Sequence, residues 1–407
     1  MFNQRPSGGR GYSGHGGNRG ASHSFNRRPS FGSNRRARFM PKALNPLVFV
    51  RPAMPEMQED VVVNHTFEDY GLSAQMLNNV KAKGYVTPTP IQDMALEAAL
   101  AGRDVLGLAD TGTGKTAVFA LAVIKKIIEN PNDTALVVAP TRELAVQIRD
   151  EIRSLSGGLQ IYASLFIGGS DIRRQLDELR RRPNVYIGTP GRLRDLYNRR
   201  ALNLSNTRTI VLDEVDRMLD MGFVHEITEL LSFLPQEHQT LLFSATIDQK
   251  VEGIAFQFMK NPEKISVKTN AGSLNVDQNI IRASGKQGKF AVLNDLLSKE
   301  TFRKVLIFGR TKYGVEEIAV CLQKSGFNAD SIHGDKRQNQ RETVLRKFKD
   351  NQIRILCATD VAARGIDVKD ITHVINFDQP ATYEDYIHRI GRTGRAGKSG
   401  IALTFVD

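Results

Sequence analysis

Two kinds of hydrophobic pattern alternate along this chain from about Phe67 onward. Short unbroken apolar runs predict buried parallel strands, and they lie at 104–109, 134–141, 185–190, 209–214 and 240–246. Between them, the segments 117–130 and 141–155 repeat apolar residues at helical spacing. This alternation predicts a parallel sheet covered by helices on both faces.

The same rhythm occurs a second time after a polar stretch. Apolar runs restart at 304–311, 353–360, 373–378 and 400–406. A chain of 407 residues is long enough for two domains, each with its own core. We therefore expect four parts, namely a tail (1–62), a first α/β domain (63–266), a linker (267–278) and a second α/β domain (279–407).

Composition favours a soluble globular protein, with 41% hydrophobic and 25% charged residues. We find neither an apolar run long enough to span a bilayer nor an apolar signal-peptide segment, so we expect no membrane contact and a cytoplasmic location. The two cysteines, Cys321 and Cys357, lack metal-ligand spacing. A disulfide framework or a zinc site is therefore not expected.

Positive charge is concentrated in the tail. Ten of the 56 Lys and Arg residues lie within residues 1–55, which contain no Asp or Glu, so the remainder carries 46 basic against 44 acidic residues. This Gly-, Ser- and Arg-rich tail cannot bury enough apolar surface to fold alone, and we expect it to be disordered. Its arginines and interspersed aromatics, Tyr12, Phe25, Phe31 and Phe39, suit loose nucleic-acid binding. The alternative is a solubilising linker.

A glycine-rich loop, "ADTGTGKT" (109–116), follows a predicted strand and opens a predicted helix. Backbone N–H groups of such a loop surround phosphate oxygens, and the helix start adds its positive dipole end. We expect Lys115 to reach the β and γ phosphates of ATP and the Thr116 hydroxyl to bind Mg²⁺. The expected nucleotide-binding residues are Thr111, Gly112, Thr113, Gly114, Lys115 and Thr116. Ala109 stands where the general motif has Gly; the alternative is a turn that binds no ligand.

Carboxylates follow the predicted strand at 209–214. A phosphate-binding loop needs an acidic partner at the end of a neighbouring strand to hold the metal, and Asp213 meets that requirement. Glu214 would orient or deprotonate the attacking water. The alternative is that these acidic residues, with Asp216, only stabilise a helix amino-terminus.

The ordered series of motifs from Phe67 to the end resembles the DEAD-box ATP-dependent RNA helicases. The segments that carry the resemblance are "GYVTPTPIQ" (84–92), "ADTGTGKT", "PTRELA" (140–145), "GG" (168–169), "TPGR" (189–192), "DEVD" (213–216), "SAT" (244–246), "LIFGRT" (306–311), "QNQR" (338–341), "ATDVAARGID" (358–367) and "HRIGRTGR" (388–395). The resemblance implies two tandem RecA-like domains and an RNA-dependent ATPase that converts ATP and water to ADP and phosphate. It also implies RNA as partner, ribonucleoprotein complexes as further substrates, and a monomer.

The resemblance also assigns roles at the nucleotide. Gln92 would read the adenine edge, and Phe67 would stack on its face. Asp216 would couple the nucleotide to the RNA site through hydrogen bonds toward Ser244 and Thr246. From the second domain, the nucleotide would be met by Gly365, Asp367, Arg392 and Arg395, the two arginines stabilising charge at the γ-phosphate.

The expected RNA contacts lie in loops after strands or near helix starts, where N–H groups and arginines can hold phosphates. They are Thr141, Arg142, Gly169, Thr189, Gly191, Arg192, Gln338, Arg341 and Thr359. Contacts of this kind grip the backbone and the 2′-hydroxyls, so binding should be nearly independent of base sequence. The preference for RNA over DNA follows from the resemblance alone.

Two departures from the family pattern stand out. Val215 replaces the usual Ala between Glu214 and Asp216, and we expect activity to survive this change. The chain stops at Asp407, directly after the last predicted strand, whereas family members usually continue into a further helix; a truncated sequence is one interpretation.

Three other functions are weighed against a helicase. An ATP-gated RNA clamp that unwinds little is the main alternative. A DNA translocase of the same architecture is disfavoured by "PTPIQ" and "HRIGRTGR". A small-molecule kinase would leave the second domain and the basic tail unexplained.

Overall fold

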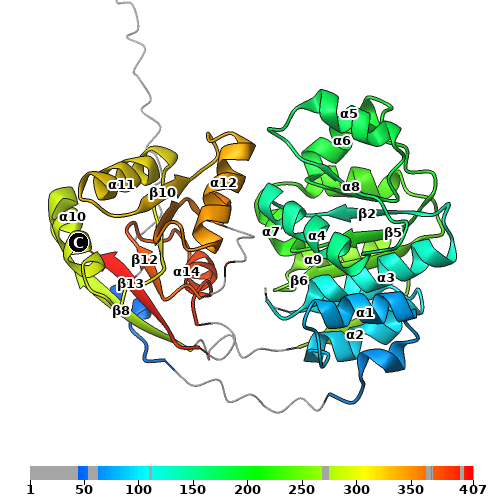
Figure 1. The fold of residues 1–407 in the computed structure, drawn as a ribbon, viewed down its shortest axis with the longest axis horizontal. Coiled ribbons are helices and arrows are strands. Elements are labelled where there is room, and N and C mark those ends of the chain that lie inside the picture. The colour runs from blue at the N-terminus through cyan, green and yellow to red at the C-terminus, as the bar shows by residue number, and fades with distance from the viewer. Residues whose placement is uncertain are drawn as a thin grey trace, which may run out of the picture. The chain divides into compact units, whose positions relative to one another are not determined.

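Two parallel α/β sheets organise the chain (Figure 1). The computed structural model describes residues 45–53, 63–109, 112–267, 275–363, 368, 370–394 and 398–406. Both sheets pair their strands in parallel throughout the named ladders. The predicted α/β class with two parallel sheets is confirmed for these residues.

The first sheet has the strand order β3-β4-β2-β5-β6-β1-β7. Its strands are β1 (Val105–Leu108), β2 (Thr134–Val138), β3 (Ala163–Phe166), β4 (Val185–Gly188), β5 (Thr207–Leu212), β6 (Gln239–Ser244) and β7 (Glu263–Ser266). The central strands are buried on both faces, which explains why their sequences are continuous apolar runs.

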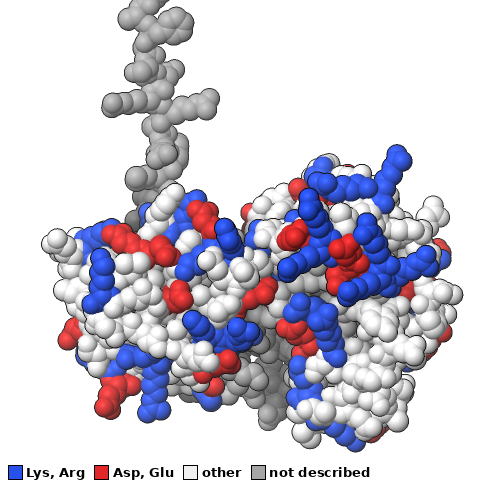
Figure 2. All heavy atoms as spheres, turned by 45° about the horizontal axis from the view of Figure 1, so that its top comes forward, with Lys and Arg blue, Asp and Glu red and all other residues white. Residues whose placement is uncertain are grey.

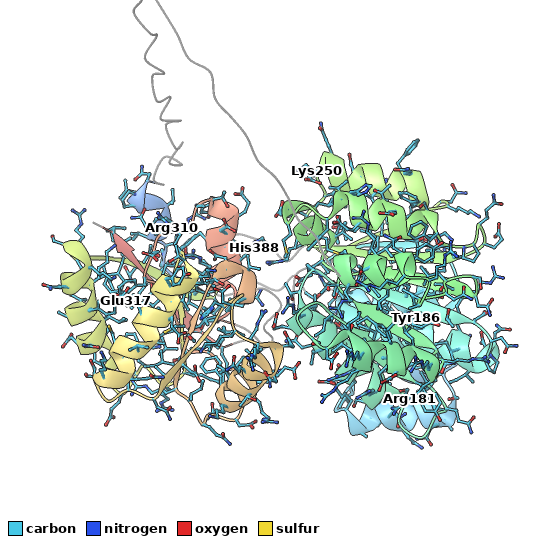
Figure 3. All side chains as sticks on the ribbon, turned by 90° about the horizontal axis from the view of Figure 1, so that it is seen from above. Arg181, Tyr186, Lys250, Arg310, Glu317 and His388 are labelled. Atoms are coloured by element: carbon cyan, nitrogen blue, oxygen red, sulfur yellow. The ribbon has the colours of Figure 1, made fainter. Side chains whose placement is uncertain are left out.

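Helices cover both faces of this sheet. They are α1 (Ala74–Ala82), α2 (Pro90–Leu100), α3 (Lys115–Glu129), α4 (Arg142–Leu155), α5 (Ile172–Arg180), α6 (Pro190–Asn198), α7 (Val215–Asp220), α8 (Val224–Ser232) and α9 (Gln249–Phe258), with a 3₁₀ turn, η2 (Phe67–Tyr70), before α1. One apolar cluster joins the sheet to α1–α4, and a second joins its other face to α6–α9. Figure 3 shows the side chains that fill these layers.

The second sheet has the order β10-β11-β9-β12-β13-β8. Its strands are β8 (Val276–Arg282), β9 (Val305–Phe308), β10 (Ala329–Ile332), β11 (Ile355–Ala358), β12 (His373–Asn376) and β13 (Gly400–Val406). Its helices are α10 (Gly285–Leu297), α11 (Lys312–Lys324), α12 (Gln338–Lys349), α13 (Asp360–Ala363) and α14 (Tyr383–Ile390). Strand β8 begins inside the stretch that the sequence assigned to the linker, because it pairs with β13 over seven residues.

Part of the expected tail packs against the second sheet. Asn45 caps the 3₁₀ turn η1 (Pro46–Phe49), and the Phe49 ring is fully buried, 4.7 Å from the ring of Tyr386. Arg51 then pairs with Gln278 of β8 through two backbone hydrogen bonds of 3.1 and 2.8 Å. The expectation of disorder therefore fails for residues 45–53, because Phe49 gains a buried apolar site. Residues 1–44 and 54–62 lie outside the described residues.

We predict that Phe49→Ala destabilises the second domain. Emptying a fully buried phenyl site costs about 3–5 kcal/mol of unfolding free energy, because the transfer term and the cavity term add. Chemical unfolding monitored by a probe in the second domain measures this loss. Leu47→Ala is the matched control, since Leu47 lies in the same turn and is 73% exposed. Identical unfolding curves for the two variants would show that the Phe49 contact adds no stability.

Acid should weaken the second domain partly through His373. Its ring lies 3.8 Å from the Phe302 ring, and burial lowers the pKa of His373 to about 4. The unfolded chain takes up this proton near pH 6.5 and the folded chain only near 4, so stability falls as pH falls across that window. His373→Phe should reduce that loss by about 2 kcal/mol, allowing for solvent screening. Unfolding free energies measured from pH 7 to pH 4 test this; parallel curves for both proteins would contradict it.

Candidate functional site

The phosphate- and metal-binding residues expected in the first domain, together with the coupling residues Ser244 and Thr246, lie at the ends of three neighbouring strands. The loop 109–116 follows β1, Asp213 and Glu214 follow β5, and the "SAT" segment overlaps the end of β6. Strands β5, β6 and β1 are adjacent and parallel, so their carboxyl ends lie at one edge of the sheet. Ligands bind at this edge in open α/β sheets.

Lys115 is hydrogen-bonded to the first residue of the glycine-rich loop. Lys115 is the first residue of α3, is buried, and donates a hydrogen bond from Nζ to the carbonyl of Ala109 at 2.8 Å. Gly114 has φ +98°, and a Cβ there would lie 2.6 Å from Gln92 Nε2. The backbone conformation therefore favours glycine at this position, and a side chain here would also displace the Gln92 amide. Thr111 lies outside the described residues.

Gln92 is hydrogen-bonded to this loop. It is the third residue of α2, where its Oε1 accepts from the Thr89 N–H at 2.9 Å, and its Nε2 donates to the Gly114 carbonyl at 3.1 Å. A side-chain amide has a second N–H and further lone pairs, so these bonds leave capacity for a base edge. The predicted adenine contact stays a prediction.

Phe67 is more enclosed than its predicted stacking role suggests. Its exposed fraction is 2%, and its ring is stacked at 6.4 Å on that of Tyr85. Stacking on adenine would therefore require neighbouring side chains to move, and this role also stays a prediction.

The two carboxylates after β5 are buried without hydrogen-bond partners at several oxygens. Within the described residues, Asp213 Oδ1 and both carboxylate oxygens of Glu214 lack such a partner. Burial raises the pKa of Asp213 to about 6; the charge of Lys115 opposes this shift and that of Glu214 adds to it. Buried carboxylate oxygens without hydrogen-bond partners favour a cation nearby.

These oxygens fit Mg²⁺. The described residues contain no cluster of three or more His, Cys, Asp or Glu side chains that could enclose a metal. Mg²⁺ does not need one, because it is usually bound by one or two carboxylates together with waters and substrate phosphates. Asp213 would provide the carboxylate and Thr116 the hydroxyl.

Two contacts of Asp216 with the "SAT" segment were predicted. The contact with Thr246 is present, and the contact with Ser244 is not. Thr246 Oγ1 donates to Asp216 Oδ2 at 3.2 Å, whereas Ser244 Oγ donates to the carbonyl of Thr246 at 2.6 Å. Ser244 therefore shapes the segment that holds the Asp216 contact. The intervening Val215 is fully buried in the apolar cluster beneath α7, consistent with a packing role.

The expected RNA contacts of the first domain follow three further strands of this sheet, β2, β4 and β3. Thr141 and Thr189 are the N-cap residues of α4 and α6, after β2 and β4 respectively. The Arg142 guanidinium lies against the two-glycine turn after β3, where a Cβ at Gly169 would overlap it. The structure thus brings "PTRELA" and "GG" into contact.

Arg192 adds an unsatisfied donor in this region. It lies in the first turn of α6, next to Gly191, and its Nη1 is buried without a hydrogen-bond partner in the described part of the chain. A guanidinium in this state is suited to a phosphate oxygen. Contact with RNA stays a prediction for all these residues.

Lys and Arg side chains also gather over the part of the first domain that carries α5 and α6 (Figure 2). Acidic side chains are interspersed among them, and Arg180 pairs with Asp177 at 2.7 Å while Arg181 pairs with Glu178 at 3.2 Å. Because local ion pairs neutralise part of this charge, we assign no RNA contact to these basic residues beyond the predicted one at Arg192.

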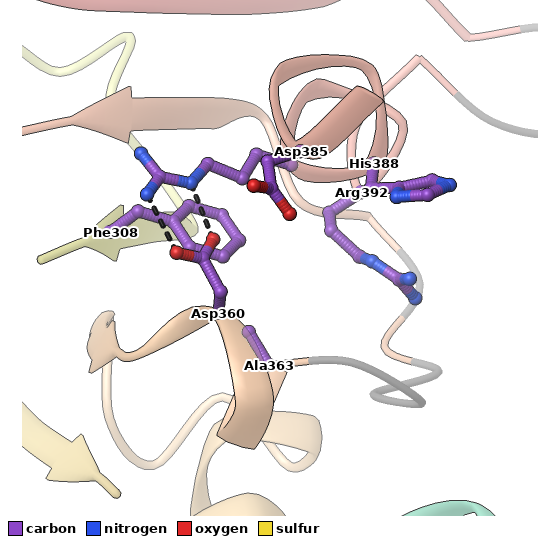
Figure 4. A pocket seen from close by; sticks show the side chains of 7 residues that line it. Phe308, Asp360, Ala363, Asp385, His388 and Arg392 are labelled. Atoms are coloured by element: carbon purple, nitrogen blue, oxygen red, sulfur yellow. Dashed lines mark hydrogen bonds and ion pairs between the residues drawn. The ribbon is translucent and has the colours of Figure 1, made fainter. Parts of the chain in front are cut away.

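In the second domain, Arg392 follows α14 and is 3% exposed (Figure 4). It lines a small pocket with Phe308, Asp360, Ala363, Asp385, His388 and Arg389. The figure shows the Arg392 side chain directed away from the Asp360 carboxylate. Arg395, Gly365 and Asp367 lie outside the described residues.

Arg389, which the sequence did not single out, holds this region together. Its guanidinium binds both oxygens of Asp360, at 2.5 and 2.8 Å, and donates to the Asp378 carbonyl at 2.7 Å. It thereby joins "HRIGRTGR" to "ATDVAARGID". The sequence shows an arginine inside "HRIGRTGR", but it does not show that this arginine pairs with Asp360, which is distant in sequence.

The other predicted RNA contacts of the second domain lie on two elements. Gln338 and Arg341 lie on α12, and Gln338 Nε2 donates to Glu342 Oε1 at 3.0 Å. Thr359 follows β11, and its carbonyl accepts from the Ala363 N–H at 2.9 Å. Their predicted contact with RNA stays a prediction.

Comparison with known proteins assigns the family. The DEAD/DEAH box helicase profile matches residues 89–254, and the helicase conserved C-terminal domain profile matches residues 288–397. The chain belongs to the DEAD-box ATP-dependent RNA helicases. It is 45% identical over 342 residues to the DEAD-box ATP-dependent RNA helicase CshA of Bacillus subtilis, covering 84% of this chain and 69% of that protein. The CshA of Geobacillus kaustophilus is 46% identical over 343 residues, covering 84% and 73%.

Solved structures of DEAD-box helicases share the fold. S. cerevisiae Dbp5 bound to RNA and ADP BeF₃ gives a TM-score of 0.75 at 30% identity, covering 84% of this chain and 90% of that one. Mss116p bound to ssRNA and AMP-PNP gives 0.76 at 30% identity, covering 87% and 76%. Among the described residues of this DEAD-box chain, none of the helices has the length and apolar character needed to cross a membrane. The family assignment implies an RNA-dependent ATPase with ATP as substrate.

Proposed function

We propose that this DEAD-box helicase grips the RNA backbone with little sequence preference and unwinds short duplexes locally. In this proposal ATP and RNA together bring the two domains into a closed state that bends one strand. Hydrolysis and phosphate release then reopen it. Ribonucleoprotein remodelling, action as a monomer and a cytoplasmic location belong to the same proposal.

This proposal rests on how the expected site residues are arranged along the carboxyl edge of the first sheet, where the ATP group and the RNA group follow different strands. Residues expected at the phosphates and the metal follow β5 and β1, the expected coupling residues Ser244 and Thr246 lie at the end of β6 between them, and residues expected at RNA follow β3, β4 and β2. Strands β2 and β5 are neighbours, so the two groups meet in the middle of the sheet. The hydrogen bond from Thr246 to Asp216 links β6 to α7 beside that boundary. It therefore supports a route from nucleotide to RNA.

In the first domain, the proposal divides phosphate binding, metal binding and activation of water among different residues. Loop N–H groups and Lys115 would hold the phosphates, Asp213 and Thr116 would hold Mg²⁺, and Glu214 would position the attacking water. Bound Mg²⁺ would neutralise charge on the phosphate oxygens. Glu214 would accept the proton that leaves this water.

From the second domain, Arg392 and Arg395 would stabilise the charge on the transferred phosphoryl group. Because these arginines and the phosphate-binding loop lie in different domains, hydrolysis would require domain closure. RNA would promote that closure by binding to residues of both domains.

Strand separation on two duplexes tests the unwinding mode. Both duplexes carry the same single-stranded overhang; one spans about one helical turn and the other about four, with roughly 10 base pairs in each turn. We expect ATP-dependent separation of the short duplex and little of the long one. Robust separation of the long duplex would contradict local unwinding. Persistent RNA retention with neither duplex separated would favour the ATP-gated clamp.

A further inference from the structure

A buried arginine, Arg217, lies beside the expected water-positioning carboxylate. Its Nε is 3.2 Å from Glu214 Oε2, and the two side chains are only 3% and 4% exposed. Arg217 belongs to none of the phosphate, metal or RNA contacts assigned above. Its side chain instead contacts Glu214, the N-cap residue that precedes α7.

Glu214 depends on this arginine for charge compensation within the described part of the chain. Neither of its carboxylate oxygens has a hydrogen-bond partner there. A buried carboxylate without a partner is strongly unfavourable, and removing one member of a buried pair leaves the other uncompensated. The Arg217 guanidinium is the cation that the structure pairs with this carboxylate.

The backbone fixes the two residues relative to each other. Glu214 has φ +53°, a left-handed conformation that non-glycine residues rarely adopt. The N–H groups of Arg217 and Met218 both donate to the Glu214 carbonyl at 3.1 Å, and the Arg217 N–H also lies 3.0 Å from Asp216 Oδ1. Unusual backbone conformations of this kind persist only where surrounding structure holds them, and they concentrate at functional sites.

Core packing then holds the turn in place. Val215, Met218 and Leu219 of α7 are buried in the apolar cluster on that face of the first sheet. The arginine therefore approaches Glu214 from an anchored helix. Its Nη1 is also buried and without a hydrogen-bond partner in the described residues, so the group has donor capacity left.

We propose that Arg217 is a positioning residue that fixes the direction of the Glu214 carboxylate for ATP hydrolysis. It acts through Glu214 and does not touch nucleotide, and the inference rests on the proposed role of Glu214. Loss of the guanidinium should let the carboxylate swing, and a misplacement of about 1 Å at a reacting group can cost ~10²-fold in rate. ATP affinity should change little, because Lys115 and the loop hold the phosphates.

The competing interpretation is an ion pair that only stabilises the fold. That role predicts lower unfolding stability in Arg217 variants, with kcat unchanged in protein that remains folded. A positioning role predicts lower kcat with KM for ATP nearly constant. It also predicts that the loss disappears once Glu214 can no longer act, because the two residues then work as one unit.

The test uses the full chain with saturating single-stranded RNA. Arg217→Met, Arg217→Lys, Glu214→Gln and the Arg217→Met/Glu214→Gln double variant are compared in single-turnover ATP hydrolysis, steady-state KM, binding of a fluorescent ATP analogue and thermal unfolding. Arg194→Met is the matched control. Arg194 pairs with Glu226 at 3.4 Å and Glu229 at 2.5 Å in the same domain, away from the ATP residues.

We expect Arg217→Met to hydrolyse ATP about 10- to 100-fold more slowly, with analogue affinity within about threefold of the parent protein. Arg217→Lys should recover part of the rate, because it keeps the charge but loses the planar fork. The double variant should match Glu214→Gln, and Arg194→Met should keep its rate. If Arg217→Met does not fold, Arg217→Lys decides by the same criteria.

Different failures are distinguishable. Parent-like hydrolysis by a folded Arg217 variant, together with an inactive Glu214→Gln, overturns the positioning role alone. Additive losses in the double variant overturn it as well. Normal turnover by Glu214→Gln overturns the proposed role of Glu214 and the inference that rests on it.

Discussion

Glu214→Gln should lower RNA-stimulated ATP hydrolysis by ~10²–10⁴-fold, the range typical of a lost general base. The substitution keeps the size of a side chain that is 4% exposed, so packing against α7 should be preserved. Lys115 and the loop around Gly114 should still hold the phosphates, and ATP binding should therefore persist. Single-turnover hydrolysis with saturating RNA, alongside binding of a fluorescent ATP analogue, measures the two properties separately.

Glu226→Gln is the control for this experiment. Glu226 lies on α8 of the same domain and pairs with Arg194, so its loss removes a carboxylate of the same kind outside the expected site. Normal hydrolysis is expected for the control. Hydrolysis by Glu214→Gln at the parent rate would mean that another group activates the water.

Arg392→Ala should reduce hydrolysis by ~10³-fold or more, since measured arginine fingers contribute ~10³–10⁵ in rate. The rate should fall because no guanidinium then stabilises the charge on the transferred phosphoryl group. Arg392→Lys should be nearly as defective, because lysine lacks the planar fork. ATP binding by the first domain should remain, so the defect should appear in the single-turnover rate and not in analogue affinity.

The control for Arg392 is Arg303→Ala. Arg303 is an exposed residue between α10 and β9 of the second domain, outside all predicted contacts. Its substitution removes the same charge from the same domain. Equal hydrolysis by Arg392→Ala and Arg303→Ala would show that Arg392 does not serve the γ-phosphate, and it would remove the main argument for catalysis by domain closure.

How far the sequence predicts this fold depends on where a strand lies in its sheet. Each of the nine predicted strand runs overlaps a strand of the structure, and the predicted helices 117–130 and 141–155 correspond to α3 and α4. The four strands without a prediction are β3, β7, β8 and β10, and each is an edge strand. Edge strands are half-solvated, so sequences such as "EKIS" and "ADSI" carry polar residues and lack the continuous apolar run.

The sequence predicts those site residues that belong to local motifs directly after a strand. Lys115, Asp213 and Glu214 could be placed because a phosphate-binding loop and a carboxylate pair are local patterns in sequence. Side-chain contacts between segments that are distant in sequence could not be predicted in this way. The Arg389–Asp360 pair and the docking of Phe49 onto Tyr386 depend on tertiary packing, which sequence periodicity does not report.

The role of Arg217 could be predicted only in part from the sequence. Its spacing from Glu214, three residues along a short helix, was visible in the sequence. What made it informative was burial of both side chains together with the left-handed backbone at Glu214, and neither feature can be read from residue types.

The most direct test of the account is steady-state ATP hydrolysis without nucleic acid, with single-stranded RNA, and with DNA of matched sequence, using Glu214→Gln as the inactive control. We predict strong stimulation by RNA alone, absent in the control. Equal rates in all three conditions would contradict the account, because the ATP and RNA groups along the first sheet would then be uncoupled.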